Sequence, residues 1–205
     1  MPDTTGASKK LRSNVIEASL IVFSVLLALF LDNVMQDRQD ARDVAELTRH
    51  IADEIQSNLT IVNKWLPYHR QVVAEIDSYI ASDQLLESLI TADGIDYGRL
   101  ANKGLIQDFY SDSAWQLAQQ SLLSSRIDFG VSSAITDAYL AQQNVNGTLQ
   151  RIVGFYSERE TYDPKQVRTS LRILRNLVKD LAGQQTVLQH NCEAALAAIA
   201  AVGGD

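Results

Sequence analysis

The chain has 205 residues, enough for one ordinary domain and a short additional segment. Apolar residues make up 46% of the chain and charged residues 21%, a balance typical of a folded protein and not of a disordered one. The net charge of −7 would repel phosphate backbones and argues against nucleic acid as the main ligand. The single cysteine, Cys192, excludes an intramolecular disulfide and a zinc site built from several cysteines.

Residues 15–35 predict a transmembrane helix, and residues 1–14 form a short basic tail before it. Residues 15–31 read VIEASLIVFSVLLALFL, and positions 18–31 carry no charge. At a rise of 1.5 Å per residue, a helix extended to Met35 is roughly 31 Å long, close to the thickness of a hydrocarbon core. Glu17 and the adjacent pair Asp32 and Asn33 would then lie near its two faces, which makes them candidate functional or interfacial positions.

Two other interpretations of this segment remain. A cleaved signal peptide also places basic residues before an apolar stretch, but no pair of small residues at cleavage spacing follows Phe30, Leu31 and Asp32. A buried helix of a water-soluble core would be apolar on all sides for four turns, which needs a larger protein around it. We therefore favour an uncleaved anchor.

The basic residues favour one orientation of this anchor. Three precede the helix closely, and three more are dispersed after it: Lys9, Lys10, Arg12, and then Arg38, Arg42, Arg49. The positive-inside rule counts basic residues near the helix ends. It predicts a single-pass protein of the cell inner membrane with a cytoplasmic N-terminus and a periplasmic domain at residues 36–205.

The start of the chain resembles a known group of proteins. Glu17 leads the stretch EASLIVFSVLLALFLDN, which ends at Asp32 and Asn33 and is followed by QDR at 36–38. This resembles the opening of a broad group of uncharacterised bacterial single-pass membrane proteins, many of which have Trp where this chain has Val34. The resemblance covers about 40 residues and implies a single-pass anchor with a helical extramembrane domain. It implies no activity.

Residues 36–205 predict an all-α extramembrane domain, an antiparallel helical bundle. In its first helix, apolar residues from Val44 to Leu66 recur at steps of three and four, close to an 11-residue repeat, which predicts a nearly straight helix. Nothing between Leu31 and Val44 breaks the pattern, so this helix can continue directly from the anchor. Pro67 should kink it or end it at Leu66.

The middle of the domain is less regular. Residues 91–111 contain three glycines and little periodicity, which predicts an irregular segment with short helical pieces. Asp112 can then cap a helix that holds Trp115, Ala118 and Leu122 on one face.

The last third predicts a coiled-coil-like hairpin. Residues 131–156 and 167–199 both repeat core positions at alternating steps of four and three. Between them, Asp163 is a natural N-cap and Pro164 suits the first helical position.

Two glutamines interrupt the apolar seams of this hairpin. Gln142 lies on the first seam and Gln185 on the second. We expect each to hydrogen-bond across the bundle or to set its register. Gly147 also lies in the first pattern and costs about 1 kcal/mol relative to alanine.

The sequence contains no catalytic, cofactor-binding or metal-binding motif that we recognise. His50 and Glu54 share a helix face at spacing i, i+4, but no second histidine follows at the spacing of a metal site. His69 lies at the predicted bend beside Pro67 and is either a ligand-facing residue or an ordinary packing residue. Cys192 lies on the seam of the last helix and is expected to be a small buried hydrophobe.

These features predict a membrane-anchored, non-enzymatic helical interaction or scaffold protein, such as an accessory subunit of a larger inner-membrane complex. Its partners would be the lipid bilayer and another protein or a second copy of the chain, with no cofactor. The alternative is a periplasmic ligand-sensing bundle. That protein would have to signal through a partner, because only about 14 residues lie across the membrane and no second span returns the chain.

Overall fold

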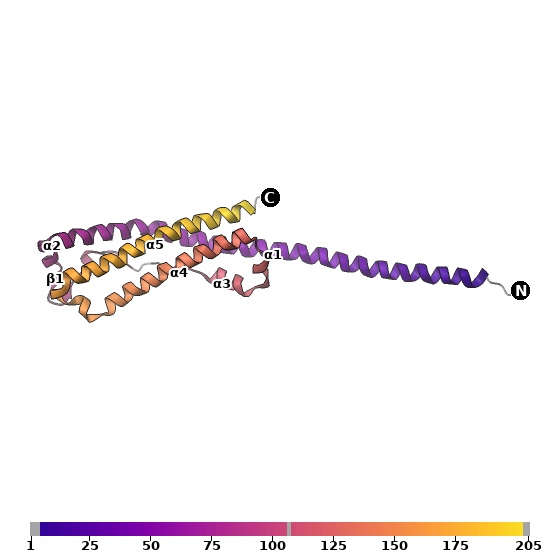
Figure 1. Cartoon of the computed structure of the whole chain (residues 1–205), viewed down its shortest axis with the longest axis horizontal. Coiled ribbons are helices and arrows are strands. Elements are labelled where there is room, and N and C mark those ends of the chain that lie inside the picture. Colours follow the sequence, from indigo (N-terminus) through magenta and orange to yellow (C-terminus); the bar gives the residue numbers. More distant parts are fainter. Residues whose placement is uncertain (1–4, 106–107, 203–205) are drawn as a thin grey trace. The chain divides into compact units, whose positions relative to one another are not determined.

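The structure is a computed structural model that describes residues 5–105 and 108–202, without the side chains of residues 5–19 and 21. Helices account for most of the described chain, which confirms the all-α prediction (Figure 1). The α-helices of this part are α1 (Thr5–Ala81), α2 (Asp83–Ser88), α3 (Ser113–Gln120), α4 (Phe129–Ser157) and α5 (Val167–Val202). Two short strands form a hairpin, β1 (Ile90–Thr91) and β2 (Gly94–Ile95).

The chain divides into two units, Met1–Glu46 and Leu47–Asp205. In the first unit, large apolar side chains between positions 20 and 35 of α1 are exposed. Among the residues that the structure describes, no helical stretch combines the length and the hydropathy that a membrane crossing requires. The span expected at residues 15–35 includes side chains outside the described part, at 15–19 and 21, and it stays a prediction.

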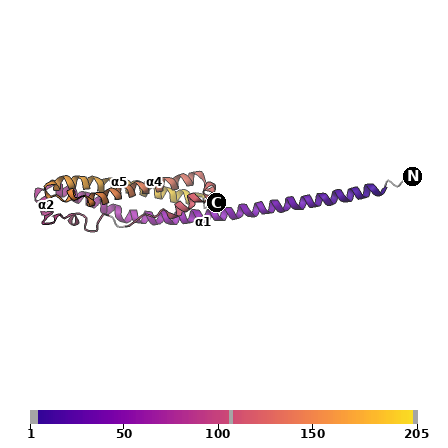
Figure 2. The ribbon, with the colours of Figure 1, turned by 90° about the horizontal axis from the view of Figure 1, so that it is seen from below.

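The second unit is built on three long helical segments, namely residues 47–81 of α1 together with α4 and α5. Hydrogen bonds pair Glu54 with Tyr139 and Asn58 with Gln142, so α1 and α4 run in the same direction. Helix α5 is antiparallel to both α1 and α4, because the residue numbers of its bonding partners rise on those helices as the numbers fall along α5. The pairs are Asn63 with Gln189 and Asp77 with Arg175 for α1, and Asp137 with Asn191 and Thr148 with Gln184 for α4. Figures 1 and 2 both show α4 and α5 side by side.

The core of the bundle follows the predicted heptad seams. On α5, buried residues recur as predicted at 171, 174, 178, 181, 185, 188, 192 and 195, whereas the predicted end positions Val167 and Ile199 are half-buried. On α4, the predicted positions 131–145 and 152 are buried, but the seam passes through Thr148 and Phe155 instead of Leu149 and Tyr156. The hairpin prediction is confirmed at this level, and burial of each large aliphatic side chain stabilises the bundle by about 1.5–3 kcal/mol.

The prediction that Pro67 ends or kinks the first helix at Leu66 is wrong as to the end, because α1 continues to Ala81 with Pro67 inside it. A proline within a helix costs about 3 kcal/mol. Packing offsets this cost, since Leu66, His69 and Val72 on either side are all buried in the bundle. Tertiary burial therefore decides the course of this helix against local propensity.

The turn between α4 and α5 is longer than a simple capped loop. A 3-10 helix at Arg159–Tyr162 precedes a second one at Pro164–Gln166, which leads into α5. The Asp163 side chain accepts a hydrogen bond from the Lys165 N–H at 2.9 Å, and Pro164 takes the first helical position. The predicted N-cap is thus confirmed, although it caps the 3-10 turn.

The segment that joins α1 to α4 contains the hairpin, which the sequence did not predict. Ile90 pairs with Ile95 and Thr91 with Gly94. Gly94 has φ 118°, and a Cβ at this position would lie 2.8 Å from the Tyr162 carbonyl oxygen. Glycine is therefore required here both by its backbone conformation and by the close approach of the α4–α5 turn.

Candidate functional site

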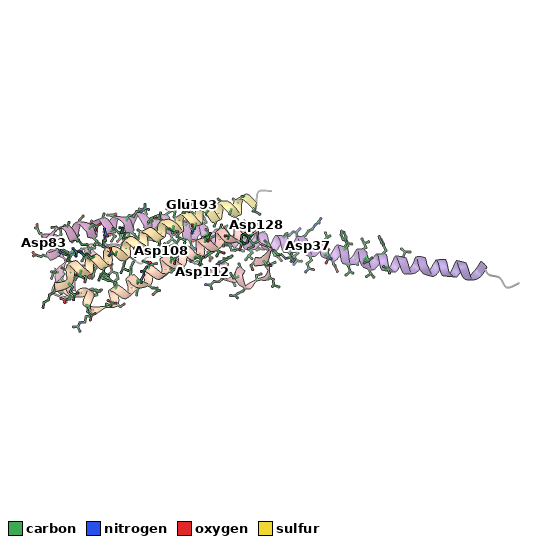
Figure 3. All side chains as sticks on the ribbon, viewed as in Figure 1. Asp37, Asp83, Asp108, Asp112, Asp128 and Glu193 are labelled. Atoms are coloured by element: carbon green, nitrogen blue, oxygen red, sulfur yellow. The ribbon has the colours of Figure 1, made fainter. Side chains whose placement is uncertain are left out.

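Residues 108–114, here called the strap, return along α1 toward the start of α4. Asp108 contacts Trp65, Ser111 contacts Asn58, and Ala114 contacts Glu54. Residue numbers rise along the strap as they fall along α1, so the two segments run antiparallel. Figure 3 labels Asp108 and Asp112, which lie on either side of Ser111 in the strap.

The centre of the strap is held by the side-chain amide of Asn58. Its Nδ2 donates to the Ser111 carbonyl oxygen at 2.6 Å, and its Oδ1 accepts from the Ser111 N–H at 2.9 Å. One buried side chain thus satisfies both backbone groups of one strap residue, as a neighbouring strand would.

Gln142 of α4 supports this contact. Its Oε1 accepts from Asn58 Nδ2 at 2.9 Å, and its Nε2 donates to the Ser111 carbonyl oxygen at 3.2 Å. Gln142 is 3% exposed, and its bond to α1 confirms the prediction that it bonds across the bundle.

Glu54 holds the end of the strap and the start of α3. Its Oε2 accepts from the Ser111 hydroxyl at 2.6 Å, the Ser113 hydroxyl at 2.9 Å and the Ala114 N–H at 3.1 Å. Its Oε1 accepts from the Tyr139 hydroxyl at 2.6 Å. A carboxylate on another helix therefore satisfies one N-terminal backbone donor of α3, the Ala114 N–H.

The prediction that Asp112 caps α3 through its side chain is therefore wrong. Asp112 occupies the N-cap position but makes no side-chain capping bond. Trp115 and Ala118 are buried as predicted, whereas Leu122 is 91% exposed, since α3 ends at Gln120 and a 3-10 helix follows. Trp115 stacks on Tyr139 with ring centroids 5.7 Å apart and anchors α3 to α4.

The charge state of Glu54 follows from these contacts. Burial acts to raise its pKa, but the hydrogen bonds from Ser111, Tyr139, Ala114 and Ser113 together outweigh burial and leave the pKa below its ordinary value. Burial, followed by the bond to Glu54, raises the pKa of the Tyr139 hydroxyl. A carboxylate with a lowered pKa is a weak base, so this pair suits capping and not the deprotonation of a serine hydroxyl.

A third polar contact joins α1, α5 and the strap. His69 is 2% exposed, and its Nδ1 lies 2.8 Å from Gln185 Oε1, to which it donates. Gln185 Nε2 in turn donates to the Tyr110 hydroxyl at 3.1 Å. The expectation for Gln185 is confirmed, because it bonds across the bundle.

Of the two roles expected for His69, the structure shows packing: the residue is buried within α1 and links this helix to α5. Cys192 is 1% exposed, and burial raises the pKa of its thiol to about 12, as expected of a small buried hydrophobe. His50 is exposed on α1, and no group of three or more possible metal ligands occurs within the described part of the chain.

The remaining candidates lie in the first unit. Asp32 and Asn33 are exposed on α1, and the side chain of Glu17 falls outside the described residues. Sequence reasoning missed Asn58 and the role of Glu54, although Asn58 falls at a core step between Ile55 and Val62, where a polar residue is itself a signal.

Comparison with known proteins adds no family. No protein-family model matches the chain, and neither the curated proteins nor the solved structures gave a significant match.

Proposed function

We propose that this protein is a membrane-anchored, non-enzymatic helical interaction protein. Residues 15–35 form the anchor, and residues 47–205 form the bundle that meets a partner, such as a larger inner-membrane assembly. The observation that carries the proposal is the apolar surface of α1 between positions 20 and 31.

The side chains on this surface are exposed around the whole helix. They are 46–64% exposed and include Leu20, Val22, Phe23, Val25, Leu26, Leu27, Leu29, Phe30 and Leu31. Burial of one such side chain is worth about 1.5–3 kcal/mol, so water is a poor solvent for this surface. A bilayer would cover it on all sides. The proposal also depends on the sequence of residues 15–19 and on Ile21.

The polar groups of this stretch are compatible with a lipid environment. Ser24 is the one serine between positions 20 and 31, and its hydroxyl donates to the Leu20 carbonyl oxygen at 2.8 Å. This bond satisfies the hydroxyl within the helix, as a hydrocarbon solvent requires. Asp32 and Asn33 then mark the point at which the helix re-enters water.

The orientation in this proposal follows the basic residues. Lys9, Lys10 and Arg12 are expected on the cytoplasmic side, and the bundle on the periplasmic side. Reporter fusions at the two ends of the full chain test it: a periplasm-dependent phosphatase should be active only at the C-terminus, and a cytoplasm-dependent fluorescent protein only at the N-terminus.

We propose no enzymatic activity, because the polar side chains of the site are engaged in bonds that hold the chain together. Glu54, Asn58 and Gln142 all bond to groups of the same chain, and these bonds hold elements together. A scaffold needs this kind of rigid bundle, since it must present a fixed surface to its partner.

The test compares the full chain with a variant that disrupts the apolar surface. Leu26→Glu with Phe30→Glu places two charges on one face of the helix, and Leu117→Glu, at an exposed position of α3, is the matched control. We expect the wild type and the control to remain with membranes after an alkaline wash and to co-purify with the same partner in mild detergent. The double variant should lose both properties. A wild-type chain found in the aqueous fraction would contradict the anchor, and a monomer in several detergents would contradict the interaction role.

A further inference from the structure

We propose that the groove that holds the strap is a binding site for an extended peptide segment of a partner protein, and that the strap is the chain's own occupant of it. The inference gives the proposed interaction function a site and a ligand class, and only the existence of a natural partner rests on that function. By groove we mean the set of side chains that bond the strap: Glu54, Asn58 and Trp65 of α1, Gln142 of α4 and Gln185 of α5.

The first argument is that the groove recognises peptide backbone. Asn58 bonds both the N–H and the carbonyl oxygen of Ser111, and Gln142 adds a second donor to the same carbonyl. These contacts do not depend on the side chain at position 111. They are the contacts by which an extended peptide gains affinity when it is added to an existing structure.

The second argument is that neighbouring contacts select side chains. Trp65 Nε1 donates to the Asp108 carboxylate at 2.6 Å, and Lys64 Nζ lies 3.0 Å from the same oxygen. Gln185 meets the Tyr110 hydroxyl, and Glu54 accepts from the hydroxyls at 111 and 113. The groove therefore fits an extended segment with a carboxylate at its start, a tyrosine two residues later and hydroxyl residues after it.

The third argument is that hydrogen bonds hold the centre of the strap. Of its two large aromatic side chains, Phe109 is 81% exposed, and Tyr110 is half-buried with its hydroxyl bonded to Gln185. The groups that bond Ser111 are the Asn58 and Gln142 amides and the Glu54 carboxylate, which water can solvate when the strap leaves. Buried Trp115 directly follows the strap and can hold its end in α3 while its centre exchanges.

The experiment uses a fluorescent, capped peptide with the sequence of residues 108–115, DFYSDSAW, and the full chain in detergent micelles. Ser111→Pro removes the N–H that Asn58 accepts and should displace the chain's own strap while leaving the groove intact. We expect this variant to bind the peptide at least tenfold more tightly than the wild type does, as measured by fluorescence anisotropy.

Two controls identify the contact. Adding Asn58→Ala to Ser111→Pro should weaken peptide binding at least tenfold. A peptide that is N-methylated at the serine equivalent to Ser111 lacks the donor and should bind neither chain. If Ser111→Pro loses native helicity, Asp108→Asn with Ser113→Ala weakens the strap through side chains alone and should show the same gain.

No peptide binding to a strap-weakened variant with native melting behaviour overturns the proposal. A wild-type dimer that forms by exchange of straps between copies also overturns it, since the occupant would then be a second copy. Failure of the anchor is distinguishable from failure of the groove: a chain that stays in the aqueous fraction without detergent and still binds the peptide would refute the anchor and leave the groove in place.

Discussion

Glu54 shows how one residue can join three parts of the bundle. Replacing it by glutamine removes the negative charge and makes part of the side chain a donor facing other donors. We expect Glu54→Gln to lower the free energy of unfolding by about 1–2 kcal/mol, since bonds to a charged group are the stronger ones but water screens this half-exposed site. Chemical denaturation measures the change. Glu75→Gln, at an exposed position of α1, is the matched control and should have little effect.

The pH dependence of this contribution has a defined sign. The folded-state pKa of Glu54 lies below the ordinary value of 4.5, so its stabilising effect is complete above that value and is lost as pH falls through the lower folded-state pKa. The stability difference between the wild type and Glu54→Gln should therefore shrink in strong acid. Denaturation curves at pH 7 and pH 3 check this, and a difference that grows in acid would show that the carboxylate is not stabilised by its donors.

Buried phenol and thiol groups give the opposite pH dependence, since their contribution to stability is lost as pH rises. Burial raises the pKa of Tyr97 to about 12 from 10.0, and that of Cys192 to about 12 from 9.0. A raised pKa in the folded state means that the stabilisation is complete below the ordinary value and is lost as pH rises toward 12. We expect the melting temperature to fall between pH 9 and 12, and Cys192→Val to fall less steeply than the wild type. Equal slopes for the two proteins would rule out the thiol as a contributor.

At the scale of a helix, α4 carries glycines that its own packing does not require. A Cβ at Gly147 or Gly154 would meet no atom within 4 Å. Alanine at either position should stabilise the bundle by about 0.5–1 kcal/mol, because glycine costs that much within a helix. Thermal unfolding measures the gain. Gly94→Ala serves as the contrast and should destabilise, because its φ of 118° and the Tyr162 carbonyl oxygen leave no room for a side chain. A loss of stability at Gly147 would indicate that something packs closely on this face.

The elements differ in how well the sequence predicts them. The seam of α5 could be predicted from 171 to 195, because apolar spacing and burial have the same physical cause, but the predicted end positions Val167 and Ile199 are only half-buried. The course of α1 past Pro67 could not, since the packing that compensates for proline comes from residues more than 100 positions away, such as Gln185 opposite His69. The prediction of how α3 is capped failed for the same reason. A side chain 60 positions distant does what local rules assign to Asp112.

The candidate site was the part least accessible to sequence reasoning. The glutamines could be singled out because they interrupt heptad seams, and both bond across the bundle. Ser111 could not, because its importance lies in its backbone N–H and carbonyl oxygen, which every non-proline residue possesses. What makes it a site is the position of Asn58, and that depends on how the strap and α1 meet.

For the whole molecule, the division at Leu47 predicts that residues 47–205 fold independently of the first unit. The buried core begins at Ile51, and the bundle contacts described above all involve residues after 47. A chain of residues 47–205 should therefore fold alone with the full chain's melting temperature and dissolve without detergent, whereas the full chain should need detergent for its apolar segment. Circular dichroism and size-exclusion chromatography measure both properties. A chain of residues 60–205 is the control: it lacks the buried Ile51 and Ile55 and also Asn58, which bonds Gln142 and the strap, and it should melt at much lower temperature or fail to fold. If the 47–205 chain were also unfolded, the two parts of the protein would be one cooperative structure, and a scaffold carried on a separate anchor would no longer describe it.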